Sequence, residues 1–264
     1  MASRDAGADG ALKILRGDAP LEAMADDEFG LKKVVDGLST TLAKRIGAAG
    51  YALGVEGPWG SGKSTLANFI AEKLEQIEGH HIIRFEPWLI GEKNVLLASF
   101  FGQLALQIDG IERGELGWSH IDRWRFARLR SKLSKKIRRY GEYIAVLATP
   151  MGGVAAADPS GVMALSAVGL KGVGLVSRLF GKSLSIEELK LQITVGLRDL
   201  GVRCPSIRMT VIIDDTDRLE PGEAVELLRM VRKVADFPYV TYVICFDGNI
   251  LSKQVENVLQ VEDG

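Results

Sequence analysis

The sequence predicts an α/β fold built on a parallel β-sheet. Short apolar runs that are typical of strands alternate along the chain with longer runs whose apolar residues recur at helical spacing. The run at 209–213 is apolar at four of five positions, as expected for a strand covered on both faces of a parallel sheet. Such alternation favours parallel pairing, with ligands at the carboxyl ends of the strands. The predicted strands lie at 52–55, 82–85, 209–213 and 239–246.

Six helices are predicted around these strands. One of them opens with Ser185 and Glu188, the spacing of a capping box in which both side chains satisfy N–H groups at the start of a helix. Gly47 and Gly79 end two of the other runs. The predicted helices cover 28–46, 62–74, 94–108, 185–200, 220–231 and 251–259.

The most specific motif is the run Gly-Pro-Trp-Gly-Ser-Gly-Lys-Ser at 57–64, between the first predicted strand and the helix that follows it. Glycines leave room for backbone N–H groups to surround a phosphate, and the helix N-terminus attracts an anion. In such a loop Lys63 reaches the β- and γ-phosphates and Ser64 ligates Mg²⁺. Nucleotide binding is therefore the first hypothesis. The predicted binding residues are Gly57, Trp59, Gly60, Ser61, Gly62, Lys63, Ser64 and Thr65.

Two carboxylates follow the third predicted strand. Asp214 is expected to hold Mg²⁺ near Ser64, and Asp215 is expected to polarise the water that attacks the γ-phosphate. Lys63 and Asp215 are thus the predicted catalytic residues, and hydrolysis of a nucleoside triphosphate is the predicted reaction. The alternative is that the paired aspartates only cap the strand end or the next helix.

Asp217 and Arg218 have two interpretations that the sequence leaves open. They form an internal ion pair, or Arg218 reaches the nucleotide of a neighbouring molecule as an arginine finger. The nucleotide itself is expected to be ATP, because the chain has no N-K-x-D run of the kind that selects guanine.

Composition limits the class of protein. The chain has 264 residues, is 47% hydrophobic and 25% charged, and carries a formal net charge of −1, which indicates a globular protein with a large core. This charge excludes a surface that attracts nucleic acid everywhere. Cys204 and Cys245 are expected to be reduced core residues. The first twenty residues lack the apolar stretch of a signal peptide, so the expected location is cytoplasmic.

The middle of the chain carries the one large charge asymmetry. Nine basic residues and one acidic residue lie between 118 and 140, and the apolar residues among them predict a basic amphipathic helix. Arg123–Arg139 is either the solvated face of a packed helix or a contact for nucleic acid or anionic membrane. The uncharged runs at 143–157 and 159–170 are too short to span a bilayer singly. A soluble helical pair, surface attachment at the inner face of a membrane and a short membrane hairpin remain open.

Four segments together resemble the KAP family of P-loop NTPases. They are the loop at 57–65, Phe-Glu-Pro-Trp at 85–88, Ile-Asp-Asp-Thr-Asp-Arg-Leu at 213–219 and Cys-Phe-Asp at 245–247. The resemblance runs from about 27 to 264. It implies a three-layer α/β/α P-loop NTPase core of the additional-strand type, in which the phosphate-loop strand lies beside a sensor strand. Asp247 matches the sensor position, so the resemblance adds it to the predicted nucleotide-binding residues.

The resemblance also implies a domain organisation. A partly ordered segment at 1–27 precedes the first part of the NTPase core at 28–112, which carries the phosphate loop. A helical insertion at 113–182 holds the basic helix and the apolar pair. The second part of the core, with the acidic strand and the sensor strand, covers 183–264.

The resemblance implies an ATP- and Mg²⁺-dependent ATPase that works as a conformational switch. Because bacterial members of the family include phage-exclusion proteins, phage defence is one expected setting for it. The alternative is a nucleotide-binding scaffold that docks on membrane or nucleic acid through the insertion with little hydrolysis. The family fold continues past the sensor strand into a fifth strand and a helical lid. Two alternatives are open: the chain is a fragment of a longer protein, or self-association or a partner protein completes the core. A missing strand would leave the phosphate-loop strand at an exposed sheet edge.

Overall fold

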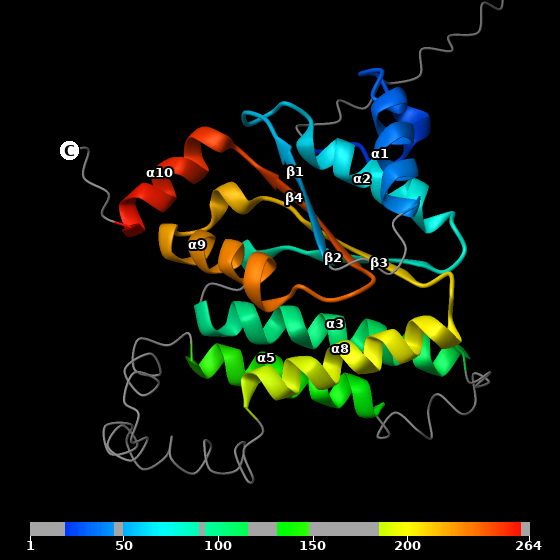
Figure 1. Ribbon diagram of the computed structural model, residues 1–264. Coiled ribbons are helices and arrows are strands. Elements are labelled where there is room, and N and C mark those ends of the chain that lie inside the picture. Colours follow the sequence, from blue (N-terminus) through cyan, green and yellow to red (C-terminus); the bar gives the residue numbers. More distant parts are fainter. Residues whose placement is uncertain (1–18, 45–49, 90–92, 116–130, 148–184, 260–264) are drawn as a thin grey trace, which may run out of the picture.

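A computed structural model of the chain describes residues 19–44, 50–89, 93–115, 131–147 and 185–259. In this part of the chain, a parallel sheet lies between two layers of helices (Figure 1). The strands are β1 (Tyr51–Glu56), β2 (His80–Phe85), β3 (Arg208–Ile213) and β4 (Val240–Phe246). The α-helices are α1 (Lys32–Lys44), α2 (Lys63–Glu75), α3 (Lys93–Glu115), α5 (Lys132–Leu147), α8 (Ile186–Arg203), α9 (Pro221–Arg229) and α10 (Gly248–Leu259). The α/β class with a three-layer core is confirmed.

The sheet has the strand order β1-β4-β3-β2, and every pairing is parallel. The register places Val55 of β1 beside Cys245 of β4, and Ile213 of β3 beside Ile244 of β4 and Phe85 of β2. The strand before the phosphate loop thus pairs with the strand that ends at Phe246, as the resemblance implied. All four carboxyl ends lie at the same edge of the sheet, which brings segments distant in sequence to one site.

Each face of the sheet has its own core. On one face, α1 and α2 cover an apolar cluster that includes Phe69, Ile70 and Val243. On the other face, α3 lies against the sheet, α5 packs on α3, and α8 packs on α5 (Figure 1). β3 is central and buried along Met209–Ile213, as its uninterrupted apolar pattern predicted.

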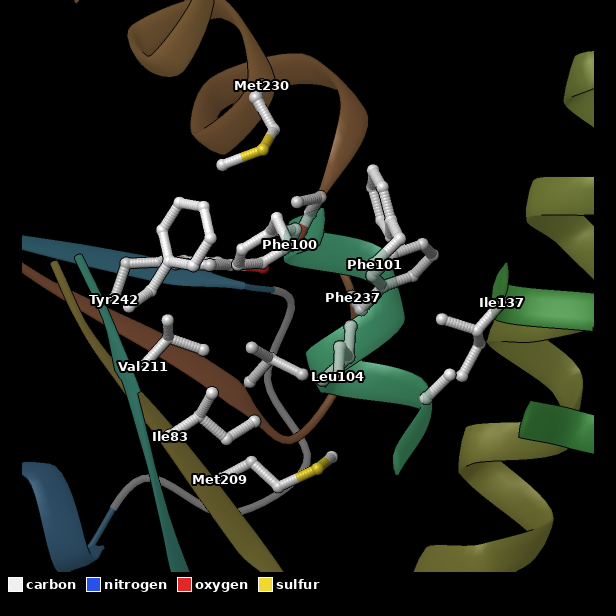
Figure 2. Packing of buried hydrophobic residues seen from close by; sticks show 14 of the residues in the cluster. Ile83, Phe100, Phe101, Leu104, Ile137, Met209, Val211, Met230, Phe237 and Tyr242 are labelled. Atoms are coloured by element: carbon white, nitrogen blue, oxygen red, sulfur yellow. The ribbon is translucent and has the colours of Figure 1, made fainter. Parts of the chain in front are cut away.

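Aromatic side chains of α3 fill the larger core. Figure 2 shows Phe100 and Phe101 of α3 between the strand residue Tyr242 and Phe237. Phe100 meets Phe85 edge to face at 5.4 Å between ring centroids, and Phe101 meets Tyr140 of α5 at 5.2 Å. These contacts attach α5 to the same core that supports the sheet.

Several helix ends differ from the sequence prediction: α1 begins at Lys32 rather than 28, α8 ends at Arg203 rather than 200, and α10 begins at Gly248 rather than 251. α3 continues to Glu115, beyond the predicted end at 108, because Ile111 extends its buried stripe. Gly110 lies inside this helix, where tertiary packing outweighs its low helix propensity. After α9, the chain continues as a π-helical turn over Met230–Val234, in which Ala235 N–H donates to Met230 C=O at 2.8 Å. Nothing in the hydrophobic spacing distinguishes this turn from α-helix.

The basic region is described only in its second half. There, Leu133 and Ile137 are buried in the predicted apolar stripe, whereas Lys132, Lys135 and Arg138 are exposed. This half belongs to a packed helix whose basic side chains are exposed, and contact of these side chains with nucleic acid or membrane stays a prediction. The predicted stripe residues Trp124, Phe126 and Leu129, the residues 123–130 and most of the two uncharged runs lie outside the described residues. Among the described helices, none has both the length and the apolar character needed to cross a bilayer.

A buried aspartate joins α3 to α5. Asp109 Oδ1 accepts hydrogen bonds from Ser131 N–H at 2.7 Å and from Ser134 Oγ at 3.4 Å, at the start of α5. Its other oxygen pairs with Arg113 one turn along α3. Asp109 lies on α3 but accepts hydrogen bonds at the N-terminus of α5, and it thereby fixes where α5 begins. Both cysteines are buried and no disulfide joins them, in agreement with their prediction as reduced core residues.

A buried histidine makes stability depend on pH. His80 is 7% exposed and its Nε2 lies 2.8 Å from Thr210 Oγ1. Burial, together with the charges of Arg208 and His81, lowers the pKa of His80 from its ordinary 6.5 to about 4. Above pH 6.5 the ring is neutral in both states. As the pH falls toward 4, the unfolded chain binds a proton that the folded chain does not bind, so stability is lost, by about 3 kcal/mol at most.

We therefore expect His80→Gln to remove most of the loss of unfolding free energy between pH 7 and pH 4.5, measured by urea denaturation. Glutamine keeps a polar group near Thr210 and does not titrate. His81→Gln, at the neighbouring and partly exposed histidine, is the control and should retain most of the wild-type pH dependence, because burial is the main cause of the lowered pKa of His80 and the His81 charge adds less. An unchanged pH dependence in His80→Gln would contradict this account.

Candidate functional site

The predicted phosphate loop connects β1 to α2 and needs its glycines. Gly60 and Gly62 have φ values of 76° and 85°, in the left-handed region that favours glycine. A Cβ on Gly57 would lie 2.5 Å from Ser61 Oγ, so a larger residue there would force the Ser61 hydroxyl to move. The loop starts at the end of β1, beside the end of β4, where Gly57 N–H donates to Phe246 C=O at 3.1 Å. Local conformation thus explains why this motif is recognisable in the sequence.

The first turn of α2 can receive an anion. Its N-cap residue, Gly62, has no side chain that could accept the N–H groups of that turn. Ser64 lies in the same turn, where the prediction makes it a metal ligand. Trp59 is 73% exposed at the outside of the loop. The geometry is compatible with the predicted roles of 57–65, which stay predictions.

Lys63 lies between its own loop and the acidic segment after β3. Its Nζ donates to Gly57 C=O at 2.9 Å and to Pro58 C=O at 3.2 Å. The same nitrogen lies 3.4 Å from Asp217 Oδ2, and the side chains of Lys63 and Asp217 are each only 9% exposed. The structure therefore brings together the two motifs, which are 150 residues apart in sequence. Asp217 is the partner that sequence spacing could not identify.

The carboxylates after β3 have an unusual backbone. Asp215 has a φ of 54°, a left-handed conformation that aspartate tolerates better than most residues but that still costs energy. Its N–H donates to Asp214 Oδ1 at 2.8 Å. The next residue, Thr216, is buried and its Oγ1 donates to Cys245 C=O at 2.7 Å, which fastens the turn to β4. Sequence reasoning missed Thr216, because only its position inside the acidic motif could have indicated a role in the site.

The pKa of Asp215 is raised above its ordinary value. Partial burial is the main cause, and the nearby carboxylates of Asp214, Asp217 and Glu86 add to it, while Arg218 opposes it. A carboxyl group whose pKa is raised accepts a proton more readily than an ordinary aspartate. This property suits a residue that activates water.

Arg218 makes two contacts within the chain, although its side chain is 50% exposed. Its guanidinium lies 3.3 Å from Asp215 Oδ2 and 5.1 Å from the centre of the Trp88 ring, a cation–π distance. The contact with Asp215 is an internal ion pair of the kind predicted for Arg218, but the partner is Asp215 rather than Asp217. Trp88 comes from the Phe-Glu-Pro-Trp segment, so two motifs of the resemblance meet here. No pattern in the sequence pairs this tryptophan with the arginine.

Asp247 has polar contacts on both its backbone and its side chain. Its N–H donates to Asp217 Oδ1 at 2.5 Å, and its own Oδ1 accepts from Asn249 N–H at 2.9 Å and from Ile250 N–H at 3.4 Å. The carboxylate therefore caps α10. A sensor role for Asp247, implied by resemblance, stays a prediction.

A segment from the predicted N-terminal region lies against the start of α2. Leu21 N–H donates to Thr65 Oγ1 at 3.1 Å, and Asn68 Nδ2 donates to Leu21 C=O at 3.0 Å. Asn68 Oδ1 in turn accepts from Arg84 at 2.7 Å. The Thr65 hydroxyl accepts in this bond and still has its O–H to donate, so the contact does not exclude it from binding a nucleotide. Sequence reasoning missed these contacts, since they depend on backbone groups that carry no sequence signal.

The acidic groups fit a sparse magnesium site. Within the part of the chain that the structure describes, no cluster of three or more His, Cys, Asp or Glu side chains is arranged to hold a metal ion. Mg²⁺ in nucleotide sites usually has one or two protein ligands and takes its other ligands from phosphates and water. The predicted pair, Ser64 and Asp214, is of this kind. Asp214 follows directly after β3, and Ser64 lies in the first turn of α2.

Comparisons with known proteins agree with this geometry. The family model described as "KAP family P-loop domain" matches residues 32–264. The chain is also similar to the phage T7 exclusion protein of Escherichia coli strain K12, with 30% identity over 252 residues. That match covers 94% of this chain and 32% of the relative, so the chain spans about a third of the length of the curated relative it matches.

Proposed function

The chain belongs to the KAP family of P-loop NTPases, and we propose that it binds ATP with Mg²⁺ and hydrolyses it as a conformational switch. The observation that carries the proposal is the approach of Lys63 to the acidic segment after β3, with 3.4 Å between Lys63 Nζ and Asp217 Oδ2. A phosphate-binding lysine and water-activating carboxylates at one sheet edge are the parts that phosphoryl transfer to water needs.

Binding of the triphosphate would use the loop and the helix behind it. N–H groups of 57–65 and the N-terminus of α2 face the phosphates, and Lys63 neutralises charge on the β- and γ-phosphates. Ser64 and Asp214 would hold Mg²⁺, which neutralises phosphate charge when it is bound. ATP is proposed rather than GTP because the chain has no guanine-selective N-K-x-D run.

Hydrolysis would depend on Asp215. A water attacks the γ-phosphorus and gives a proton to the Asp215 carboxylate, while the bond from phosphorus to the bridging oxygen of ADP breaks. The raised pKa of Asp215 favours this transfer. Arg218 lies 3.3 Å from the carboxylate and is placed to keep it ionised until the water arrives.

We propose that hydrolysis changes how the chain is bound to a partner. Within the described sheet, β1 lies at an edge, and Ala52, Gly54 and Glu56 along it are exposed. We propose that another strand, from a second copy or from a partner protein, pairs with this edge and senses hydrolysis. The similar E. coli protein is named for exclusion of phage T7, which supports a role in phage defence for this chain.

The test is calorimetric titration of ATP in the presence and absence of Mg²⁺, followed by phosphate release on the same samples. We expect Mg²⁺-dependent binding and turnover, and we expect Ser64→Ala to lose about tenfold in Mg²⁺-dependent affinity, since it removes one ligand oxygen. Thr40→Ala, which removes an exposed hydroxyl on α1, is the control. A folded wild type that binds no ATP would overturn the proposal.

A further inference from the structure

Lys63 makes contacts in this structure that a nucleotide must compete for. An ammonium group has three donors, and the oxygens of Gly57, Pro58 and Asp217 lie within 2.9–3.4 Å of Nζ. The Asp217 contact is the only one of the three with a charged partner. A phosphate that takes up Lys63 therefore has to replace or share an ion pair that is largely shielded from water.

Asp217 is also attached to the opposite side of the site. Its Oδ1 accepts from Asp247 N–H at 2.5 Å, and Asp247 in turn caps the first turn of α10. A second connection lies nearby, where Gln254 Nε2 of α10 donates to Leu219 C=O at 2.7 Å. One carboxylate thus links the phosphate-binding lysine to the end of β4 and the start of α10.

We propose that Asp217 is a positioning residue that lowers nucleotide affinity by competing with the phosphates for Lys63, and that this competition couples phosphate binding to the β4–α10 junction. The inference rests on the proposed function, because it requires a nucleotide at this loop. When phosphates take the donors of Lys63, the Asp217 carboxylate loses its cation and faces added negative charge. It then moves away from the phosphates, and its hydrogen bond to Asp247 lengthens.

A purely structural ion pair makes the opposite prediction. If Asp217 only supported the loop, its removal would loosen the site and weaken binding. If Asp217 competes, its neutralisation removes both the competing partner and the repulsion between carboxylate and phosphate, so binding tightens. The sign of the change in affinity separates the two roles.

The test is Asp217→Asn, which keeps an oxygen for Asp247 N–H and removes the charge. We expect ATP and ADP to bind about five- to tenfold more tightly than to wild type in calorimetric titration. Asp199→Asn, at an exposed aspartate on α8, is the matched control and should leave affinity unchanged. Unchanged or weaker binding by a folded Asp217→Asn, with wild type binding normally, overturns this inference alone. Absence of binding by wild type overturns the proposed function instead.

Hydrogen exchange on wild type tests the coupling without any variant. On addition of ATP, we expect the Asp247 amide to exchange about threefold faster or more, because its acceptor moves away. Amides in the middle of β3, such as that of Val211, serve as an internal control and should not change. An Asp247 amide that exchanges at the same rate with and without ATP overturns the coupling.

Discussion

Replacing Lys63 by methionine should weaken ATP binding by about 100-fold or more, because it removes the one buried cation that the structure places at the phosphate loop within the described residues. Methionine has a similar length and packs well, so the loop should keep its shape. The measurement is calorimetric titration of ATP with Mg²⁺. Lys73→Met is the matched control: Lys73 lies on the same helix, is partly exposed and pairs with Asp36.

A loss of binding counts only if the variant is folded. Lys63→Met leaves Asp217, which is 9% exposed, without its cation, and this should lower the free energy of unfolding. The double variant Lys63→Met/Asp217→Asn should recover that stability, measured by urea denaturation, but not the affinity. Near-normal ATP binding in a folded Lys63→Met would contradict the assignment of the phosphate site.

The sequence predicts most where local chemistry decides the structure. The phosphate loop is recognisable because Gly60 and Gly62 adopt a backbone that other residues avoid. The four strands are recognisable because buried strands require apolar runs. The strand order, in contrast, rests on the resemblance to a family, since nothing in a strand's own residues states which strand lies beside it.

The parts of the site that sequence reasoning missed depend on contacts across long separations. Lys63 with Asp217, Thr216 with Cys245, and Arg218 with Trp88 are pairs that form only after the sheet brings its strand ends together. The arginine-finger interpretation of Arg218, which the charge pattern left open, stays a prediction. The contact with Trp88 comes from a different motif and is visible only in three dimensions.

Replacing Asp215 by asparagine should lower phosphate release by about 100-fold or more while ATP affinity stays within about threefold of wild type. An amide cannot take a proton from the attacking water, but it has the same shape and tolerates the left-handed φ of 54° at this position. Binding should not suffer, because the variant also removes a negative charge near the phosphates. Single-turnover phosphate release and titration on the same samples make the measurement, with Asp199→Asn as control.

The same substitution should stabilise the fold, which separates loss of catalysis from loss of structure. The folded pKa of Asp215 is raised, chiefly by burial, so the folded chain gains a proton more readily than the unfolded chain. Its contribution to stability is thus most favourable at low pH and falls as the pH rises through the raised pKa. At pH 7 the ionised carboxylate is a cost that asparagine removes. We therefore expect Asp215→Asn to unfold at a higher urea concentration than wild type at pH 7, and a destabilised variant would mean that Asp215 supports the fold rather than the reaction.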